Sequence, residues 1–112
     1  MNMLNENAKL SEKIFTDAVE QAPTRDGFGK GTVAAGKADA RVVVLCADLA
    51  ESTRAEWFQK EFPERYIEMG VAEQNMATVA AGLAAAGKIP FTASYAAFNP
   101  GRNYEQLSLI HI

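Results

Sequence analysis

Two spacings of hydrophobic residues run along the chain, and each spacing predicts its own kind of element. The uninterrupted apolar run Val42–Leu45 is typical of a strand that is covered on both faces of a parallel sheet. Short apolar segments at 66–69 and 90–95 predict two further strands. Apolar residues that recur every three or four positions predict helices instead, and the segments expected to be helical are 10–19, 52–62, 70–87 and 104–112.

The order of these elements predicts the fold class. Strand, helix, strand, helix and strand with short connections indicate right-handed parallel crossovers, and so an α/β domain built on a parallel sheet with flanking helices. Asp48 follows the first strand, Gly70 and Glu73 follow the second, and Phe98–Asn99 follow the third. Because open α/β sheets bind ligands at the carboxyl ends of their strands, we expect these groups to lie side by side.

Two segments precede the first strand. An apolar stripe from Leu10 to Val19 predicts a leader helix that ends before Pro23, so 1–23 is interpreted as a leader segment and 24–112 as the domain. Thr24–Gly36 offers Asp26 as an N-cap and carries glycines at 27, 29 and 31. A phosphate-binding loop would follow a strand and end in Lys-Ser/Thr, whereas this segment precedes the strand. A glycine-rich helix packed closely on its neighbours is therefore favoured.

The helices at 52–62 and 70–87 carry start and stop signals. Thr53 and Glu56 have the spacing of a capping box, and Pro63 ends the first of these helices. Gly87 ends the second, and Glu73 lies in its first turn, where the helix dipole favours a carboxylate. The pattern alone leaves two interpretations of Glu73 open, namely compensation of the dipole and a catalytic carboxylate.

Composition excludes several classes of function. A chain of 112 residues with 48% hydrophobic and 22% charged residues is one folded domain at most. Its net charge of −3 gives no support to nucleic-acid binding. Cys46 and His111 are the single cysteine and histidine, which argues against disulfides, multi-cysteine zinc sites and histidine-based hydrolases. Without a membrane-spanning run or a signal peptide, the expected location is the cytoplasm.

Five segments carry a resemblance to a known family. The segments are Cys-Ala-Asp-Leu-Ala-Glu-Ser (46–52), Phe-Pro-Glu-Arg-Tyr (62–66), Gly-Val-Ala-Glu-Gln-Asn-Met (70–76), Ala-Ala-Gly-Leu-Ala (80–84) and Pro-Phe-Thr-Ala-Ser-Tyr-Ala-Ala-Phe (90–98). With these segments in order and at the family's spacing, the sequence from about Thr24 to Gln106 resembles the pyrimidine-binding domain of transketolase, in the C-terminal subunit of the split type.

The resemblance implies a thiamine diphosphate site. Glu73 matches the glutamate that hydrogen-bonds N1′ of the aminopyrimidine and so activates the cofactor, which favours the catalytic interpretation. Phe98 matches the aromatic residue that stacks on that ring, and Tyr95 is either a neighbour in the site or a core residue. Asp48 and Leu49 match the pair near the thiazolium, where a carboxylate compensates the positive charge.

The resemblance also implies substrate and partner contacts. Arg25 and Ser52 match positions that hold the phosphate end of a sugar phosphate, although Ser52 is also acceptable as a helix cap and Arg25 as a solvated charge. Arg102 lies in a family-like stretch but receives no role. No Gly-Asp-Gly and Asn signature is present, so Mg²⁺ and the diphosphate are expected on a partner, the N-terminal subunit, in a hetero-oligomer with dimeric symmetry.

Residues 107–112 do not resemble the family's continuation, so the sequence is interpreted as a truncated form of the domain. The implied activity is transfer of a two-carbon ketol unit between sugar phosphates. Two alternatives are retained. The chain could belong to a 1-deoxyxylulose-5-phosphate synthase, against which the Asp48-Leu49 and Ser52 block argues, or it could be a non-catalytic interaction module or an inactive remnant.

Overall fold

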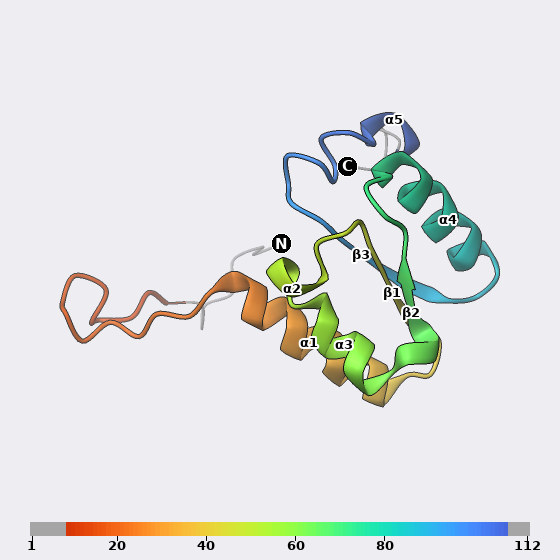
Figure 1. Ribbon diagram of the computed structural model, residues 1–112. Coiled ribbons are helices and arrows are strands. Elements are labelled where there is room, and N and C mark those ends of the chain that lie inside the picture. Colours follow the sequence, from red (N-terminus) through yellow and green to blue (C-terminus); the bar gives the residue numbers. More distant parts are fainter. Residues whose placement is uncertain (1–8, 108–112) are drawn as a thin grey trace, which may run out of the picture.

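A three-stranded parallel sheet forms the centre of the computed structural model, which describes residues 9–107 (Figure 1). The strands are β1 (Val42–Cys46), β2 (Tyr66–Glu68) and β3 (Ile89–Ala93), and their order in the sheet is β2-β1-β3. Both outer strands run parallel to β1. The predicted α/β class, with a parallel sheet and flanking helices, is confirmed.

Helices cover both faces of the sheet. α1 (Thr24–Ala38) and α3 (Ala55–Glu61) lie on one face, and α4 (Glu73–Ala85) lies on the other (Figure 1). The remaining helical segments are short, and they are α2 (Ala50–Thr53), the 3-10 turn η1 (Pro63–Arg65) and α5 (Tyr104–Leu107). No helix among residues 9–107 has the length and apolar character needed to cross a membrane.

β1 is the core of the domain. All five of its residues are buried, and because side chains alternate along a strand they divide between the two helical layers. Val42, Val44 and Cys46 pack in the cluster that contains Phe58 of α3, and the other two residues pack in the cluster that contains Met76 of α4. Burial on both faces explains why this run shows no polar alternation.

Two glycines bring α1 against α3. A Cβ atom at Gly29 would lie 2.6 Å from Cε3 of Trp57, and one at Gly36 would lie 2.6 Å from Cε2 of Phe58. The prediction of a closely packed glycine-rich helix is therefore confirmed for these two positions. Nothing lies within 4 Å of a Cβ at positions 27 or 31, so those glycines have no packing role.

The helix predicted over 52–62 is divided at Arg54, which has φ 65° and separates α2 from α3. The guanidinium of Arg54 reaches Asp26 of α1 at 3.0 Å. The expected capping box is wrong, because the Thr53 hydroxyl donates to the carbonyl of Leu49 at 2.8 Å and Glu56 instead pairs with Lys60. Asp26 is likewise not an N-cap, because it lies within the first turn of α1 and Pro23 stands at the cap position.

The leader helix predicted over Leu10–Val19 is also wrong. This segment forms isolated turns, such as the one closed by the hydrogen bond from Ile14 N–H to the Ser11 carbonyl at 3.1 Å. It leads away from the sheet (Figure 1), and the Phe15 side chain is 95% exposed. A short amphipathic segment without a surface to pack on gains too little to hold a helix. Of the helix predicted over 104–112, residues 104–107 are helical and 108–112 lie outside the described residues.

Candidate functional site

The carboxyl ends of the three strands are in register. Cys46, the last residue of β1, pairs with Glu68 of β2 and with Ala93 of β3. The segments that follow the strands therefore leave the sheet at one edge, as predicted for the groups around Asp48, Glu73 and Phe98. This edge is where parallel α/β sheets bind ligands.

Glu68 ties two of these segments together. Its Oε1 accepts hydrogen bonds from the backbone N–H of Asp48 at 2.8 Å and of Gly70 at 2.9 Å, and its Oε2 accepts one from the Tyr66 hydroxyl at 2.7 Å. Asp48 and Gly70 both have left-handed backbone, with φ 59° and 69°. Burial by itself would raise the pKa of Glu68, but the hydrogen bonds from Tyr66, Asp48 and Gly70 outweigh it and lower the pKa below its ordinary value.

Glu73, the first residue of α4, is a buried carboxylate with 4% of its surface exposed. Nη1 of Arg102 lies 3.3 Å from its Oε1 and 3.5 Å from its Oε2. The Asn103 side chain donates to the backbone carbonyl of Glu73 at 3.2 Å. The loop after β3 is thus attached to the amino-terminal end of α4, and a cation stands beside the buried carboxylate.

Aromatic rings continue from this ion pair. Cζ of Arg102 lies 4.0 Å from the ring centroid of Phe98, within the range of a cation–π contact. The rings of Phe98 and Tyr95 are stacked with their centroids 6.1 Å apart and their planes at 27°. Glu73, Arg102, Phe98 and Tyr95 therefore form one continuous series of contacts.

Two hollows open beside this series. The first, of about 610 Å³, is lined by Arg25, Ser52, Ser94 and Tyr95 among others. The second, of about 550 Å³, is lined by the residues at the start of α4 and by the loop that contains Arg102. The first hollow brings together both predicted substrate residues and Tyr95, and Glu73 lines the second.

The two residues predicted to lie near a thiazolium take different environments. Asp48 is exposed at the end of β1, where the hydrogen bond to Glu68 fixes its backbone. Leu49 is half-buried and packs against the cluster around Phe58. Neither residue contacts Glu73 through an interaction described above, so their place in a common site stays a prediction.

Residues 20–111 match the family described as transketolase, pyrimidine binding domain. The chain belongs to that family. It is 51% identical over 81 residues to a protein of Methanocaldococcus jannaschii provisionally named transketolase C-terminal section, a match that covers 72% of this chain and 26% of that protein. It is 38% identical over 100 residues to the 1-deoxy-D-xylulose-5-phosphate synthase of Bacillus velezensis, covering 88% of this chain and 16% of the synthase.

A solved structure agrees with this assignment. A chain described as split-gene transketolase, inactive β4 tetramer, superposes with a TM-score of 0.65 at 50% identity, covering 73% of this chain and 27% of that one. The present chain therefore spans about a quarter of the length of these two transketolase relatives.

Three residues of this pyrimidine-binding domain were not singled out by their sequence pattern. Arg102, Asn103 and Glu68 make the contacts that connect the strand ends, yet none of them lies in a periodic pattern or a capping motif. Glu73 and Arg102 are 29 residues apart in the sequence and meet only in the folded chain. A local signal for these contacts does not exist, because they depend on which loops meet at the edge of the sheet.

Proposed function

We propose that this chain supplies the pyrimidine-binding part of a thiamine diphosphate-dependent transketolase that transfers a two-carbon ketol unit between sugar phosphates. The observation that carries the proposal is the buried Glu73 carboxylate, which is 4% exposed and connected through Arg102 to the Phe98 ring. An aminopyrimidine ring needs an acid for its ring nitrogen and an aromatic face on which to stack. Glu73 and Phe98 are of the types that meet both needs, so the residues present fit the cofactor.

Each of the predicted catalytic and cofactor-binding residues has a distinct part in this proposal. Thiamine diphosphate, when bound, supplies a thiazolium carbon that adds to the ketose carbonyl. Glu73 would hold a proton in common with N1′ of the pyrimidine, and its burial keeps water from competing for that proton. Phe98 and Tyr95 would hold the ring by stacking, Leu49 would supply an apolar contact, and the exposed Asp48 would compensate the positive charge of the thiazolium.

Arg25 and Ser52 are proposed to bind the phosphate end of the sugar. Both line the hollow of about 610 Å³, and Arg25 comes from α1 while Ser52 comes from α2. A guanidinium and a hydroxyl that converge on one hollow are a suitable pair of donors for a phosphate. The Ser94 hydroxyl, which is buried without a partner in the described part of the chain, lines the same hollow and adds a third donor.

A partner subunit with a diphosphate-binding domain is part of the proposal. The partner would contribute the Mg²⁺ and diphosphate contacts, in a hetero-oligomer with twofold symmetry. The solved relative described as an inactive β4 tetramer agrees with a requirement for a second kind of subunit. We therefore expect this chain alone to be inert in transfer assays.

The test is reconstitution. The chain is mixed with an N-terminal transketolase subunit, thiamine diphosphate and Mg²⁺, and two-carbon transfer from a ketose phosphate to ribose 5-phosphate is measured. Glu73→Gln is expected to lower the rate by at least about 100-fold, because the amide cannot exchange the proton. Glu56→Gln is the matched control, since Glu56 pairs with Lys60 on α3. Equal rates in the two variants would contradict the role of Glu73.

A second candidate reaction is 1-deoxyxylulose-5-phosphate synthesis, which the match to the Bacillus velezensis synthase favours. Replacing the ketose phosphate donor with pyruvate, and ribose 5-phosphate with glyceraldehyde 3-phosphate, distinguishes the two reactions, because the two-carbon unit that remains when pyruvate loses CO₂ must join a three-carbon aldehyde phosphate to give the five-carbon product. The third candidate is a non-catalytic interaction module. A folded complex that is inert with both donors would support that alternative over either enzyme.

A further inference from the structure

One side chain contacts both residues that the proposed function assigns to the aminopyrimidine. Arg102 places Nη1 3.3 Å from Oε1 of Glu73 and Cζ 4.0 Å from the centroid of Phe98. We propose that Arg102 is a positioning residue, which fixes the Glu73 carboxylate relative to the Phe98 ring and so prepares both for the pyrimidine. This inference rests on the proposed function, because it concerns the same ring.

Charge is the first part of the argument. Glu73 is 4% exposed, and a buried carboxylate is strongly destabilising unless a cation or several donors accompany it. Arg102 supplies that cation, with its Nη1 atom 3.3 Å from Oε1 of Glu73. Its side chain is 49% exposed, so the guanidinium remains partly hydrated while it compensates the buried charge.

The geometry of the ion pair leaves room for a second donor. Only Nη1 reaches the carboxylate, at 3.3 Å from Oε1 and 3.5 Å from Oε2, rather than the two parallel hydrogen bonds of a forked arginine–carboxylate pair. An ionised carboxylate has about four lone-pair directions. Arg102 can therefore orient Glu73 without using the acceptor capacity that a pyrimidine nitrogen requires.

The contact with Phe98 fixes the aromatic partner. The Cζ atom of Arg102 lies 4.0 Å from the ring centroid, within the range of cation–π attraction. A lysine at this position would keep the charge but would present a compact ammonium group in place of the broad, planar guanidinium. The two contacts of Arg102 are thus chemically separable, which makes the inference testable with two different substitutions.

The backbone of Arg102 is held independently of its side chain. Asn103 is fully buried, and its Nδ2 donates to the Glu73 carbonyl at 3.2 Å and to Oδ1 of Asn99 at 2.8 Å. Nδ2 of Asn99 in turn donates to the Thr92 hydroxyl of β3 at 3.0 Å. Because these amides anchor the loop, we expect Arg102→Ala to leave the loop in place and to remove only the guanidinium.

The experiment measures cofactor affinity instead of turnover. Thiamine diphosphate is titrated calorimetrically, with Mg²⁺ present, into the reconstituted complex that carries wild-type chain, Arg102→Ala or Arg102→Lys. Arg102→Ala is expected to weaken binding about tenfold, the effect of losing one charge-assisted contact. Arg102→Lys is expected to recover part of that loss, to about threefold weaker than wild type, because only the charge is restored.

Two controls separate positioning from a general structural effect. Arg41→Ala removes another exposed arginine that pairs with a carboxylate, Asp39, at 2.7 Å but at the opposite edge of the sheet, and it is expected to leave the affinity unchanged. In a chain that already carries Glu73→Gln, adding Arg102→Ala is expected to weaken cofactor binding by less than about threefold, because Arg102 acts largely through Glu73.

Three results would overturn the inference while leaving the proposed function intact. The first is wild-type cofactor affinity in Arg102→Ala. The second is tighter binding in Arg102→Ala, which would mean that the guanidinium competes with the pyrimidine ring. The third is a loss of affinity on Arg102→Ala that is equal in chains with and without the Glu73 carboxylate. A wild-type complex that does not bind the cofactor would overturn the proposed function, and this inference with it.

Discussion

Replacing Gly29 with alanine is expected to destabilise the domain, whereas the same change at Gly31 is expected to stabilise it. Both glycines lie inside α1, only two residues apart. A Cβ at position 29 would lie 2.6 Å from Cε3 of Trp57 and 2.7 Å from Cβ of Arg54, well inside the 3.4–4 Å of ordinary van der Waals contact. A Cβ at position 31 meets nothing within 4 Å.

The magnitude follows from two opposing terms. Replacing glycine with alanine in a helix interior stabilises the folded domain by about 0.5–1 kcal/mol, and this applies to both variants. Overpacking at a tight contact destabilises the folded domain by about 1–3 kcal/mol, and this applies only to Gly29→Ala. The contact atoms at position 29 include Cβ of Arg54, which moves only with its backbone, so the helices must separate. The two variants should therefore differ in stability by about 1–3 kcal/mol, with Gly31→Ala the more stable.

Urea unfolding followed by far-ultraviolet circular dichroism measures this difference. Trp57 fluorescence is a poor probe here, because the substitution at position 29 contacts that ring directly. Gly36→Ala, which places its Cβ 2.6 Å from Cε2 of Phe58, should behave like Gly29→Ala. A Gly29→Ala chain as stable as Gly31→Ala would show that α1 and α3 do not pack as described.

Three further predictions follow from the ionisable groups. Hydrogen bonds hold the pKa of Glu68 below its ordinary 4.5 despite burial, so the stability that they contribute is present above pH 4.5 and is lost as the pH falls through the lower pKa of the folded state. The urea midpoint should therefore fall more between pH 6 and pH 3 for wild type than for Glu68→Gln, and an equal fall in the two proteins would refute this. The hydrogen bond from the Arg41 side chain lowers the pKa of Asp39 to about 2. In Arg41→Ala, a titration followed by the carboxyl ¹³C signal should show the Asp39 pKa moving toward 3.8, and an Asp39 pKa equal to that of wild type would contradict the pairing. Burial raises the pKa of the Cys46 thiol, which is fully buried. The thiol should therefore react with Ellman's reagent only as fast as the domain opens, and a fast reaction in native buffer would contradict its burial.

The sequence predicted those features of the fold that depend on local pattern. The run Val42–Leu45 indicated a strand covered on both faces, because only burial on both sides removes the need for polar alternation. The strand and helix order then determined the parallel topology, and with it the edge where Asp48 and Glu73 emerge.

The features that the sequence did not predict depend on partners distant in the chain. The stripe from Leu10 to Val19 has helical spacing but no surface to pack on, so the pattern alone was misleading. The division at Arg54 occurs where its guanidinium reaches Asp26, a residue 28 positions away that no local pattern connects to it. The roles of Arg102 and Glu68 likewise require knowledge of which loops meet.

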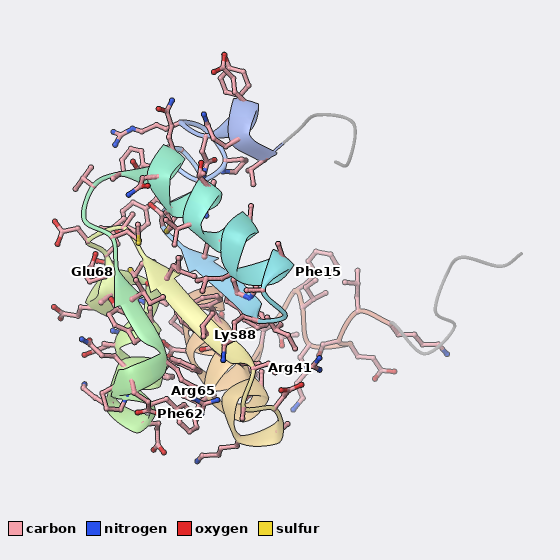
Figure 2. All side chains as sticks on the ribbon, turned by 90° about the vertical axis from the view of Figure 1, so that its right-hand side faces the viewer. Phe15, Arg41, Phe62, Arg65, Glu68 and Lys88 are labelled. Carbon is pink, nitrogen blue, oxygen red and sulfur yellow. The ribbon has the colours of Figure 1, made fainter. Side chains whose placement is uncertain are left out.

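The parallel direction of the strands has a practical consequence for handling the chain. Arg41, Arg65 and Lys88 directly precede β1, β2 and β3, so they lie at the amino ends of the strands, whereas Glu68 ends β2 at the other edge (Figure 2). A fluorescent dye or a sensor chip coupled through Lys88, which is exposed, would be attached on the side opposite to both hollows. Immobilised in this way, the protein should present its binding edge to ligands and subunits in the flowing solution.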